Sequence, residues 1–220
     1  MWHKFHNLHL GQTGIIIGNG PSLRRVPRSF LNHYPTFGSN RCYLPSGYIP
    51  DYYVVVNNLL IEQYHKEIAA IHSREKFVKA QFAYLIHDSI PVRSVHEHIF
   101  STNPAQGIYE GYTVTYAAMQ LAYWMGFSTI LLVGCDHNYN QDGRPNQTQK
   151  MTGDDPNHFS PDYFKGGFWN LADIQRMTEA YEMAKCAFEL AGRKIVNLTE
   201  GTRLDVFEKA SIEDYYRIPA

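Results

Sequence analysis

Short hydrophobic runs, rich in β-branched and aromatic residues, recur along the chain and predict six β-strands. They cover residues 15–17, 36–38, 52–56, 77–82, 130–133 and 194–198. Helical patterns lie between several of these runs, at residues 58–72, 112–125 and 170–191. Strands that alternate with helices are typical of parallel sheets covered on both faces. We therefore predict a single α/β domain over residues 1–220, Rossmann-like and three-layered, with a mostly parallel sheet.

A long polar segment follows the fifth predicted strand. Residues 138–168 are dominated by Asn, Asp, Gly, Pro, Gln and Lys, and long insertions of this kind inside a compact domain are usually functional or disordered. The same stretch contains Phe159, Tyr163 and Phe164, aromatic residues that can be buried. This combination predicts a lid-like insertion, mobile when empty, that packs its aromatic residues when it closes over a ligand.

The first predicted strand leads into the sequence Gly18-Asn19-Gly20-Pro21-Ser22. The two glycines allow a tight turn and a close approach of the backbone to a ligand. Pro21 suits the first turn of a helix, whose free N–H groups and positive end would favour a phosphate. Residues 18–22 are therefore candidate phosphate-binding residues, although Leu23 stands where a dinucleotide-binding fingerprint has its third glycine.

Asparagine or aspartate follows four of the six predicted strands. Asn19, Asn40 and Asn57 follow the first three strands, and Asp136-His137-Asn138 comes shortly after the fifth. Ligands bind outside the carboxyl ends of strands in open parallel sheets, so we expect these residues to meet at one crevice. Asparagine carries both donors and acceptors and can recognise a base or sugar without adding charge beside a phosphate. The alternative is that each asparagine only caps its own turn.

Two of the eleven histidines lie where a catalytic base would be useful. His137 follows Asp136 at a strand end, and His158 lies within the predicted lid. A neutral histidine can accept the proton of a sugar or alcohol hydroxyl group. The alternative for each is a histidine solvated in a polar loop.

Composition excludes several classes of protein. With 20 Lys and Arg residues against 21 Asp and Glu, the formal net charge of −1 provides no general field for nucleic acid or anionic membranes. The three cysteines are far apart and form no CxxC pair, which argues against a disulfide framework or a structural zinc site. No hydrophobic run approaches the roughly 20 residues of a transmembrane helix. We expect a soluble, cytoplasmic protein.

Four strand ends, taken in order, carry recognisable motifs. They are Gly-Asn-Gly-Pro-Ser-Leu at 18–23, Phe-Gly-Ser-Asn at 37–40, Val-Val-Asn at 55–57 and Val-Gly-Cys-Asp at 133–136. From residue 13 to about residue 200, the chain resembles the MptE-like family of Rossmann proteins, named for 6-hydroxymethylpterin diphosphokinases, and the related bacterial sialyltransferases of glycosyltransferase family 42. The resemblance implies the same fold and a nucleotide-dependent transferase activity.

The resemblance to the sialyltransferases also implies roles for individual residues. It implies that Asn19, Asn40 and Asn57 bind the cytidine nucleotide of CMP-sialic acid. It also implies that His158 acts as a base without a metal. The chain departs from that pattern at Gly111, where those enzymes have an arginine, and at Asn138-Tyr139, where a phosphate-binding tyrosine is displaced by one position. These departures leave the donor and the acceptor open.

The expected function is that of a metal-independent glycosyltransferase that uses a nucleotide-activated sugar, such as a CMP-linked one, and a carbohydrate acceptor to build glycoconjugates or polysaccharides. No cofactor besides the donor is expected. Candidate catalytic residues are His158, Asp136 and His137. Candidate nucleotide-binding residues are Gly18, Asn19, Gly20, Pro21, Ser22, Asn40, Asn57, Thr113, Asn138 and Tyr139.

Two alternatives stay open at this level. A magnesium-dependent pyrophosphokinase acting on a pterin-like alcohol would take its metal ligands from Asp136, Asp142, Asp154 or Asp155. A nucleotide-binding protein without catalysis would need only the binding residues. The sequence also leaves open whether the chain forms a homo-oligomer.

Overall fold

A computed structural model describes residues 1–45 and 47–216. Its centre is an eight-stranded sheet in the order β12-β11-β8-β1-β2-β3-β4-β5, in which all neighbouring strands are parallel. The strands are β1 (Thr13–Ile17), β2 (Thr36–Ser39), β3 (Tyr52–Val55), β4 (Glu75–Lys79), β5 (Ser89–Val92), β8 (Thr129–Val133), β11 (Lys194–Asn197) and β12 (Glu208–Lys209). All six predicted strands are present, and the predicted α/β fold is confirmed.

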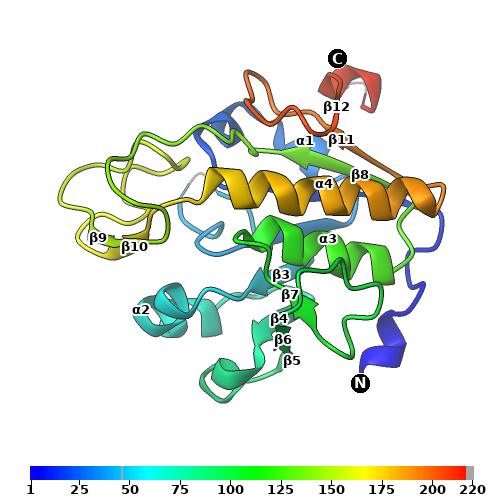
Figure 1. Cartoon of the computed structure of the whole chain (residues 1–220), viewed down its shortest axis with the longest axis horizontal. Helices are drawn as coiled ribbons and strands as arrows, with labels where there is room; N and C mark the ends of the chain where they lie inside the picture. The colour runs from blue at the N-terminus through cyan, green and yellow to red at the C-terminus, as the bar shows by residue number, and fades with distance from the viewer. Residues whose placement is uncertain (46, 217–220) are drawn as a thin grey trace.

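Helices cover both faces of this sheet. The α-helices are α1 (Arg28–Leu31), α2 (Asn58–Ala69), α3 (Val114–Trp124) and α4 (Ile174–Leu190), and the 3-10 helices are η1 (Trp2–Phe5), η2 (Pro21–Arg25), η3 (Ala80–Leu85) and η4 (Ile212–Asp214). Figure 1 shows α3 and α4 side by side along one face of the sheet. Helices α1 and α2 cover the opposite face, so the fold has the three predicted layers.

Strand β1 runs through the middle of the sheet and illustrates why the sequence folds in this way. Ile16 packs in the hydrophobic cluster formed with α3 and α4, whereas Ile15 and Ile17 pack in the cluster on the side of α1 and α2. All three side chains are buried. A central parallel strand is hydrophobic on both faces because helices cover both faces.

Strands β4, β5 and β12 differ from the prediction. The fourth strand ends at Lys79 and not at Phe82, because residues 80–85 form η3. Strands β5 and β12 were not predicted, since both are short and β5 contains Pro91. Proline is tolerated there because β5 is an edge strand whose outer side needs no ladder hydrogen bonds.

Two small sheets lie outside the main one. Strands β6 (Ser94–Val95) and β7 (Ile108–Tyr109) pair in parallel, and β9 (Thr148–Lys150) and β10 (Phe168–Asn170) pair antiparallel. The second pair spans most of the predicted lid and extends to the left of α4 in Figure 1. The insertion therefore has secondary structure of its own.

The aromatic residues of the predicted lid are packed in this structure, and the mobility of the lid stays a prediction. Phe159, Tyr163 and Phe164 are buried in the cluster that also contains residues of α2 and β1. The Phe159 N–H donates to the Asn19 carbonyl at 2.8 Å, and the Arg41 guanidinium donates to the carbonyls of Asp162 and Tyr163. The segment carrying His158 is thus docked on the sheet edge as part of the core.

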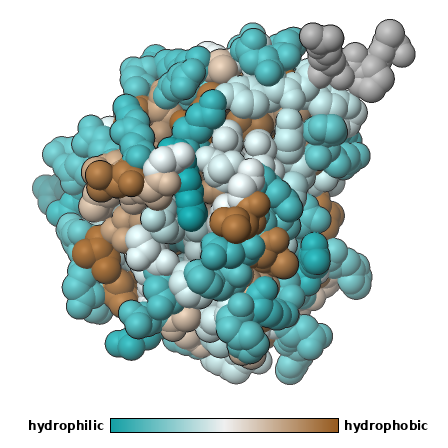
Figure 2. Space-filling model, turned by 90° about the vertical axis from the view of Figure 1, so that its right-hand side faces the viewer, coloured by the Kyte–Doolittle hydropathy of each residue, from teal (hydrophilic) through white to brown (hydrophobic). Residues whose placement is uncertain are grey.

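Neither the helices nor the surface drawn in Figure 2 divides the described part of the chain into further units. Within residues 1–45 and 47–216, every helix is too short or too polar to cross a bilayer. On the face drawn in Figure 2, the described hydrophobic residues form small, separate groups among hydrophilic ones. Homo-oligomer formation stays an open question.

Candidate functional site

A cavity of about 930 Å³ opens at the carboxyl edge of the sheet. Its walls include residues that follow β1, β2, β3, β5 and β8, and it lies beside the point where the strand order reverses, between β1 and β8. Ligands of doubly wound proteins bind at this point. The volume falls within the range of about 300 to 1,000 Å³ that is typical of small-molecule sites.

The cavity brings together all but two of the predicted site residues. Those that line it are Gly18, Asn19, Gly20, Asn40, Asn57, Thr113, Asp136, His137, Asn138, Tyr139 and His158. Pro21 and Ser22 are not among its lining residues. Convergence of the strand-end asparagines is therefore a property of the fold, while their binding roles stay predictions.

The predicted roles of Pro21 and Ser22 in phosphate binding stay predictions, and both residues have structural roles in the loop after β1. Pro21 does open a helix, but η2 is a five-residue 3-10 helix. The Ser22 backbone N–H and hydroxyl both donate to the Asp136 carboxylate, at 3.1 and 2.6 Å. A carboxylate of the protein therefore binds Ser22 in this structure. Asp136 holds the loop after β1 against the loop after β8.

The two glycines of the motif serve the same junction. A Cβ at Gly18 would overlap the Gly134 carbonyl, and one at Gly20 would overlap the Asp136 carboxylate. The close approach that these glycines permit is thus between two loops of the protein. Both glycines still contribute backbone to the cavity wall.

The N-terminus of α3 lies at the cavity, as do the N-cap residues of α2 and α4. Thr113 is the N-cap residue of α3, with the hydroxyl accepting from the Thr115 N–H at 3.3 Å and lying 3.3 Å from the Tyr181 hydroxyl. Residues 113–115 all line the cavity. The positive end of this eleven-residue helix favours an anionic group in the cavity.

Asn19 and Asn40 lie on neighbouring strand ends and leave two acceptors unused. The Asn19 side-chain amide donates to the Ser39 carbonyl at 3.2 Å. Among the described residues, the buried Oδ1 atoms of Asn19 and Asn40 have no hydrogen-bond partner. Both oxygen atoms are shielded from the cavity, so Asn19 and Asn40 line it with other atoms.

Asn57 combines a structural role with its place in the cavity. Its Oδ1 accepts from the Leu60 N–H at 3.0 Å, which caps the N-terminus of α2. The turn-cap interpretation therefore holds for the oxygen of Asn57. The exposed side-chain amide is left to contact a ligand.

Asn57→Ser separates these two roles. Serine caps a helix about as well as asparagine, so we expect thermal stability to change little, whereas Asn57→Ala should cost about 0.5–2 kcal/mol. Because serine lacks the amide donor, nucleotide binding should weaken by about 0.5–1.5 kcal/mol in calorimetry. Unchanged affinity in the serine variant would reduce Asn57 to a helix cap.

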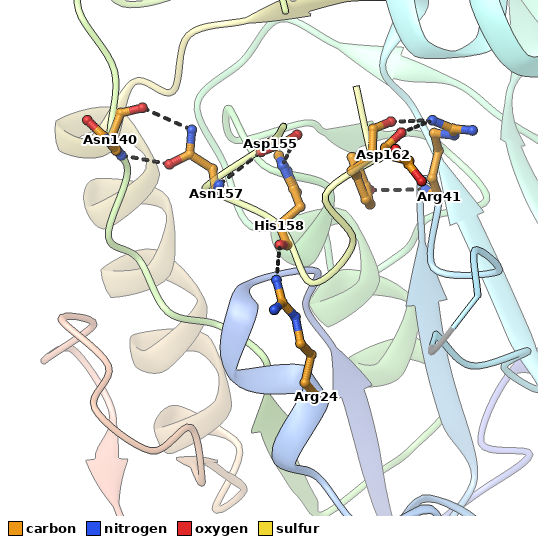
Figure 3. A network of polar contacts seen from close by, with 8 residues as sticks. Arg24, Arg41, Asn140, Asp155, Asn157, His158 and Asp162 are labelled. Atoms are coloured by element: carbon orange, nitrogen blue, oxygen red, sulfur yellow. Dashed lines mark hydrogen bonds and ion pairs between the residues drawn. The ribbon is translucent and has the colours of Figure 1, made fainter. Parts of the chain in front are cut away.

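His158 is held in one orientation at the cavity wall (Figure 3). Its Nδ1 lies 2.8 Å from Oδ2 of Asp155, and its ring stacks on Tyr163 at a centroid distance of 4.0 Å. An ionised carboxylate only accepts hydrogen bonds, so this contact favours a proton on Nδ1, and in the neutral ring Nε2 would then keep its lone pair. Among the described residues, nothing bonds to Nε2. This is the protonation pattern that a general base requires.

His137 has the opposite pattern. The Thr178 hydroxyl donates to the Ile174 carbonyl and so accepts from Nε2 of His137, which lies 3.0 Å away. Burial lowers the pKa of His137, and nearby Asp205 opposes that shift only in part. The residue also separates the main cavity from a second one of about 480 Å³. His137 is thus a neutral histidine whose Nε2 proton is already used.

The pKa values of two further residues of the cavity wall are raised. Burial raises the pKa of Tyr139, with added repulsion from Cys135 and Asp136, so its phenol stays protonated and can donate to a phosphate. Burial also raises the pKa of the Cys135 thiol to about 12, which rules out a thiolate nucleophile at neutral pH.

The sequence patterns did not identify the residues that line the cavity near β5 and β7. Lys79 pairs with Glu110 at 2.6 Å, and Arg93 lies beside them on the cavity wall. The signal for Arg93 was hidden because its strand was not predicted. At Gly111, where the sialyltransferase pattern has an arginine, the backbone is left-handed at φ +60° and a Cβ would overlap Tyr116. Arg93 is a cationic residue of the cavity wall that the sequence analysis did not name.

A family model described as "6-hydroxymethylpterin diphosphokinase MptE-like" matches residues 1–142. The chain belongs to the MptE-like family. No curated protein matches it.

Solved structures share the fold of this MptE-like protein. The MAf glycosyltransferase of Magnetospirillum magneticum AMB-1 superposes with a TM-score of 0.58 and 16% identity over 94% of this chain, which spans only 35% of that protein. The sialyltransferase CstII of Campylobacter jejuni, in complex with cytidine-5'-monophosphate, gives a TM-score of 0.51 and 15% identity over 92% of this chain and 86% of CstII. The MptE-like protein therefore has a glycosyltransferase-like fold.

The carboxylates named for the magnesium alternative are dispersed in the MptE-like protein. Asp136 binds Ser22, Asp154 pairs with Lys165 at 2.8 Å, and Asp155 binds His158. Over residues 1–45 and 47–216, no three His, Cys, Asp or Glu side chains gather where they would hold a metal.

Proposed function

We propose that this chain is a glycosyltransferase that uses a nucleotide-activated sugar, such as a CMP-linked one, and needs no metal for transfer. The observation that carries the proposal is His158, whose Nδ1 lies 2.8 Å from a buried carboxylate while the residue lines a nucleotide-sized cavity with neutral asparagines. The glycosyltransferase-like fold and the CMP bound to CstII support the choice of donor.

Residues from several sides of the cavity contribute to donor binding. Asn19 and Asn40, which line the cavity at the ends of β1 and β2, contact the nucleotide there. The N-terminus of α3, capped by Thr113, and the phenol of Tyr139 face the phosphate. The single phosphodiester of a CMP-linked donor, held in this way, needs no carboxylate-bound magnesium.

Transfer then breaks one bond and forms one. The acceptor hydroxyl attacks the anomeric carbon of the donor sugar, and the bond from that carbon to the phosphate oxygen breaks. Nε2 of His158 takes the proton of the hydroxyl, and CMP leaves with the electron pair of the broken bond. The α3 N-terminus stabilises the charge that develops on the leaving phosphate.

A panel of nucleotides tests the donor and the metal together. We expect CMP to raise the melting temperature more than CDP, UDP, GDP or ATP, because a ligand of the native state stabilises it by roughly 2.7 kcal/mol at a hundredfold excess over Kd. EDTA should not change this response, nor the release of CMP from CMP-sialic acid, measured with water as the acceptor.

Other results would point to the alternatives. A response to ATP that requires magnesium would favour the pyrophosphokinase, which the family description supports. Tight CMP binding without release of CMP from the donor, with or without magnesium, would leave a nucleotide-binding protein that is not a transferase.

A further inference from the structure

The carboxylate of Asp155 is fully buried, with 0% of its side chain exposed. Its Oδ1 accepts from the Asn157 backbone N–H at 2.9 Å, and its Oδ2 accepts from Nδ1 of His158 at 2.8 Å. Burying an ionised carboxylate is costly unless its oxygens are paired, and here the two oxygens have different donors. The Asn157 contact shapes the turn, whereas the His158 contact reaches the cavity.

The surrounding network fixes both members of this pair (Figure 3). The Asn157 side chain exchanges two hydrogen bonds with the Asn140 backbone, at 2.6 and 3.1 Å. Arg24 donates to the carbonyl of Phe159, the residue that follows His158, at 2.6 Å. With its ring also stacked on Tyr163, the imidazole has little freedom to turn.

We infer that Asp155 is a positioning residue for the base. It keeps the proton of neutral His158 on Nδ1, presents the lone pair of Nε2 to the cavity, and stabilises the imidazolium that forms when Nε2 takes a proton. The inference rests on the proposed function for its catalytic part. Its tautomeric part concerns the protein alone.

Asp155→Asn tests the inference because the backbone decides how the new amide is oriented. The Asn157 N–H needs an acceptor, so the oxygen of the asparagine takes the place of Oδ1. Its NH₂ group then faces Nδ1 of His158, which must accept. The proton of the imidazole is thereby moved to Nε2, the atom that needs a lone pair.

Two readouts are compared in the full chain. In ¹⁵N spectra of histidine-labelled protein, at a pH where His158 is neutral, we expect the wild type to show a protonated Nδ1 and Asp155→Asn to show a protonated Nε2. Release of CMP from CMP-sialic acid should fall by at least about a hundredfold with CMP affinity retained. Asp162→Asn is the matched control, because the Asp162 carboxylate is exposed and, among the described residues, pairs only with Lys165, at 3.7 Å.

Three results would overturn the inference. A wild-type spectrum with the proton on Nε2 does so without any variant, even if Asp155→Asn fails to fold. An unchanged tautomer in folded Asp155→Asn contradicts the role of the carboxylate, and a changed tautomer with normal CMP release contradicts the catalytic part. If the wild type releases no CMP, the proposed function fails and takes the catalytic part with it, whereas the spectrum still decides the tautomer.

Discussion

Replacement of His158 by alanine is expected to lower CMP release from CMP-sialic acid by roughly a hundredfold to ten-thousandfold, the usual contribution of a general base. Nucleotide affinity should change little, because the predicted nucleotide-binding groups belong to the loops after β1, β2, β3 and β8 and to the N-terminus of α3. Steady-state kinetics and calorimetry on the same preparation measure the two effects separately.

Two histidines provide controls for this result. His87 is exposed and does not line the cavity, so His87→Ala should keep wild-type turnover. His137→Ala should reduce turnover less than His158→Ala, because Nε2 of His137 already donates to Thr178. Normal turnover of His158→Ala together with an inactive His137→Ala would assign the base to the end of β8.

Phe159→Ala is expected to lower the free energy of unfolding by about 3–5 kcal/mol, the usual cost of removing a buried phenylalanine. Only 1% of Phe159 is exposed, and its ring packs edge-on against Tyr163 at a centroid distance of 5.9 Å. Urea denaturation followed by circular dichroism measures the change. The cost arises because the insertion is part of the core.

Phe168 provides the matched control for Phe159. It lies in the same polar region of the sequence, but 45% of it is exposed, so Phe168→Ala should change the unfolding free energy by no more than about 0.5 kcal/mol. Similar small effects for both variants would mean that the docked segment opens freely in solution. The insertion would then behave as the mobile lid that its composition predicts.

The main strands and helices could be predicted from the sequence because their patterns are local. Ile15 to Ile17 are buried whichever helix covers them, and Asn57 and Thr113 cap the helices that follow them. The strand-end asparagines could be placed at one edge for a related reason. Parallel strands point the same way, so residues that follow them meet without any knowledge of the strand order.

The edge strand β5 and the contact between Ser22 and Asp136 could not be predicted in this way. Strand β5 contains Pro91, which local propensity excludes and which only an edge position permits. The partner of Ser22 is Asp136, which is 114 residues away. Nothing near the glycine motif indicates that a carboxylate of the protein occupies the end of that short helix.

The sequence by itself determined the alternation of strands and helices, the glycine turn and the asparagines that follow the strands, because these depend on periodicity and backbone conformation over a few residues. Only the tertiary structure decided that the polar insertion is docked and that His158 is presented to the cavity by Asp155. Arg41 and Asn19 follow other strands and hold that insertion: the Arg41 guanidinium donates to the Asp162 carbonyl, and the Asn19 carbonyl accepts from the Phe159 N–H. Contacts between distant segments have no local signal, because they depend on which surfaces the fold brings together.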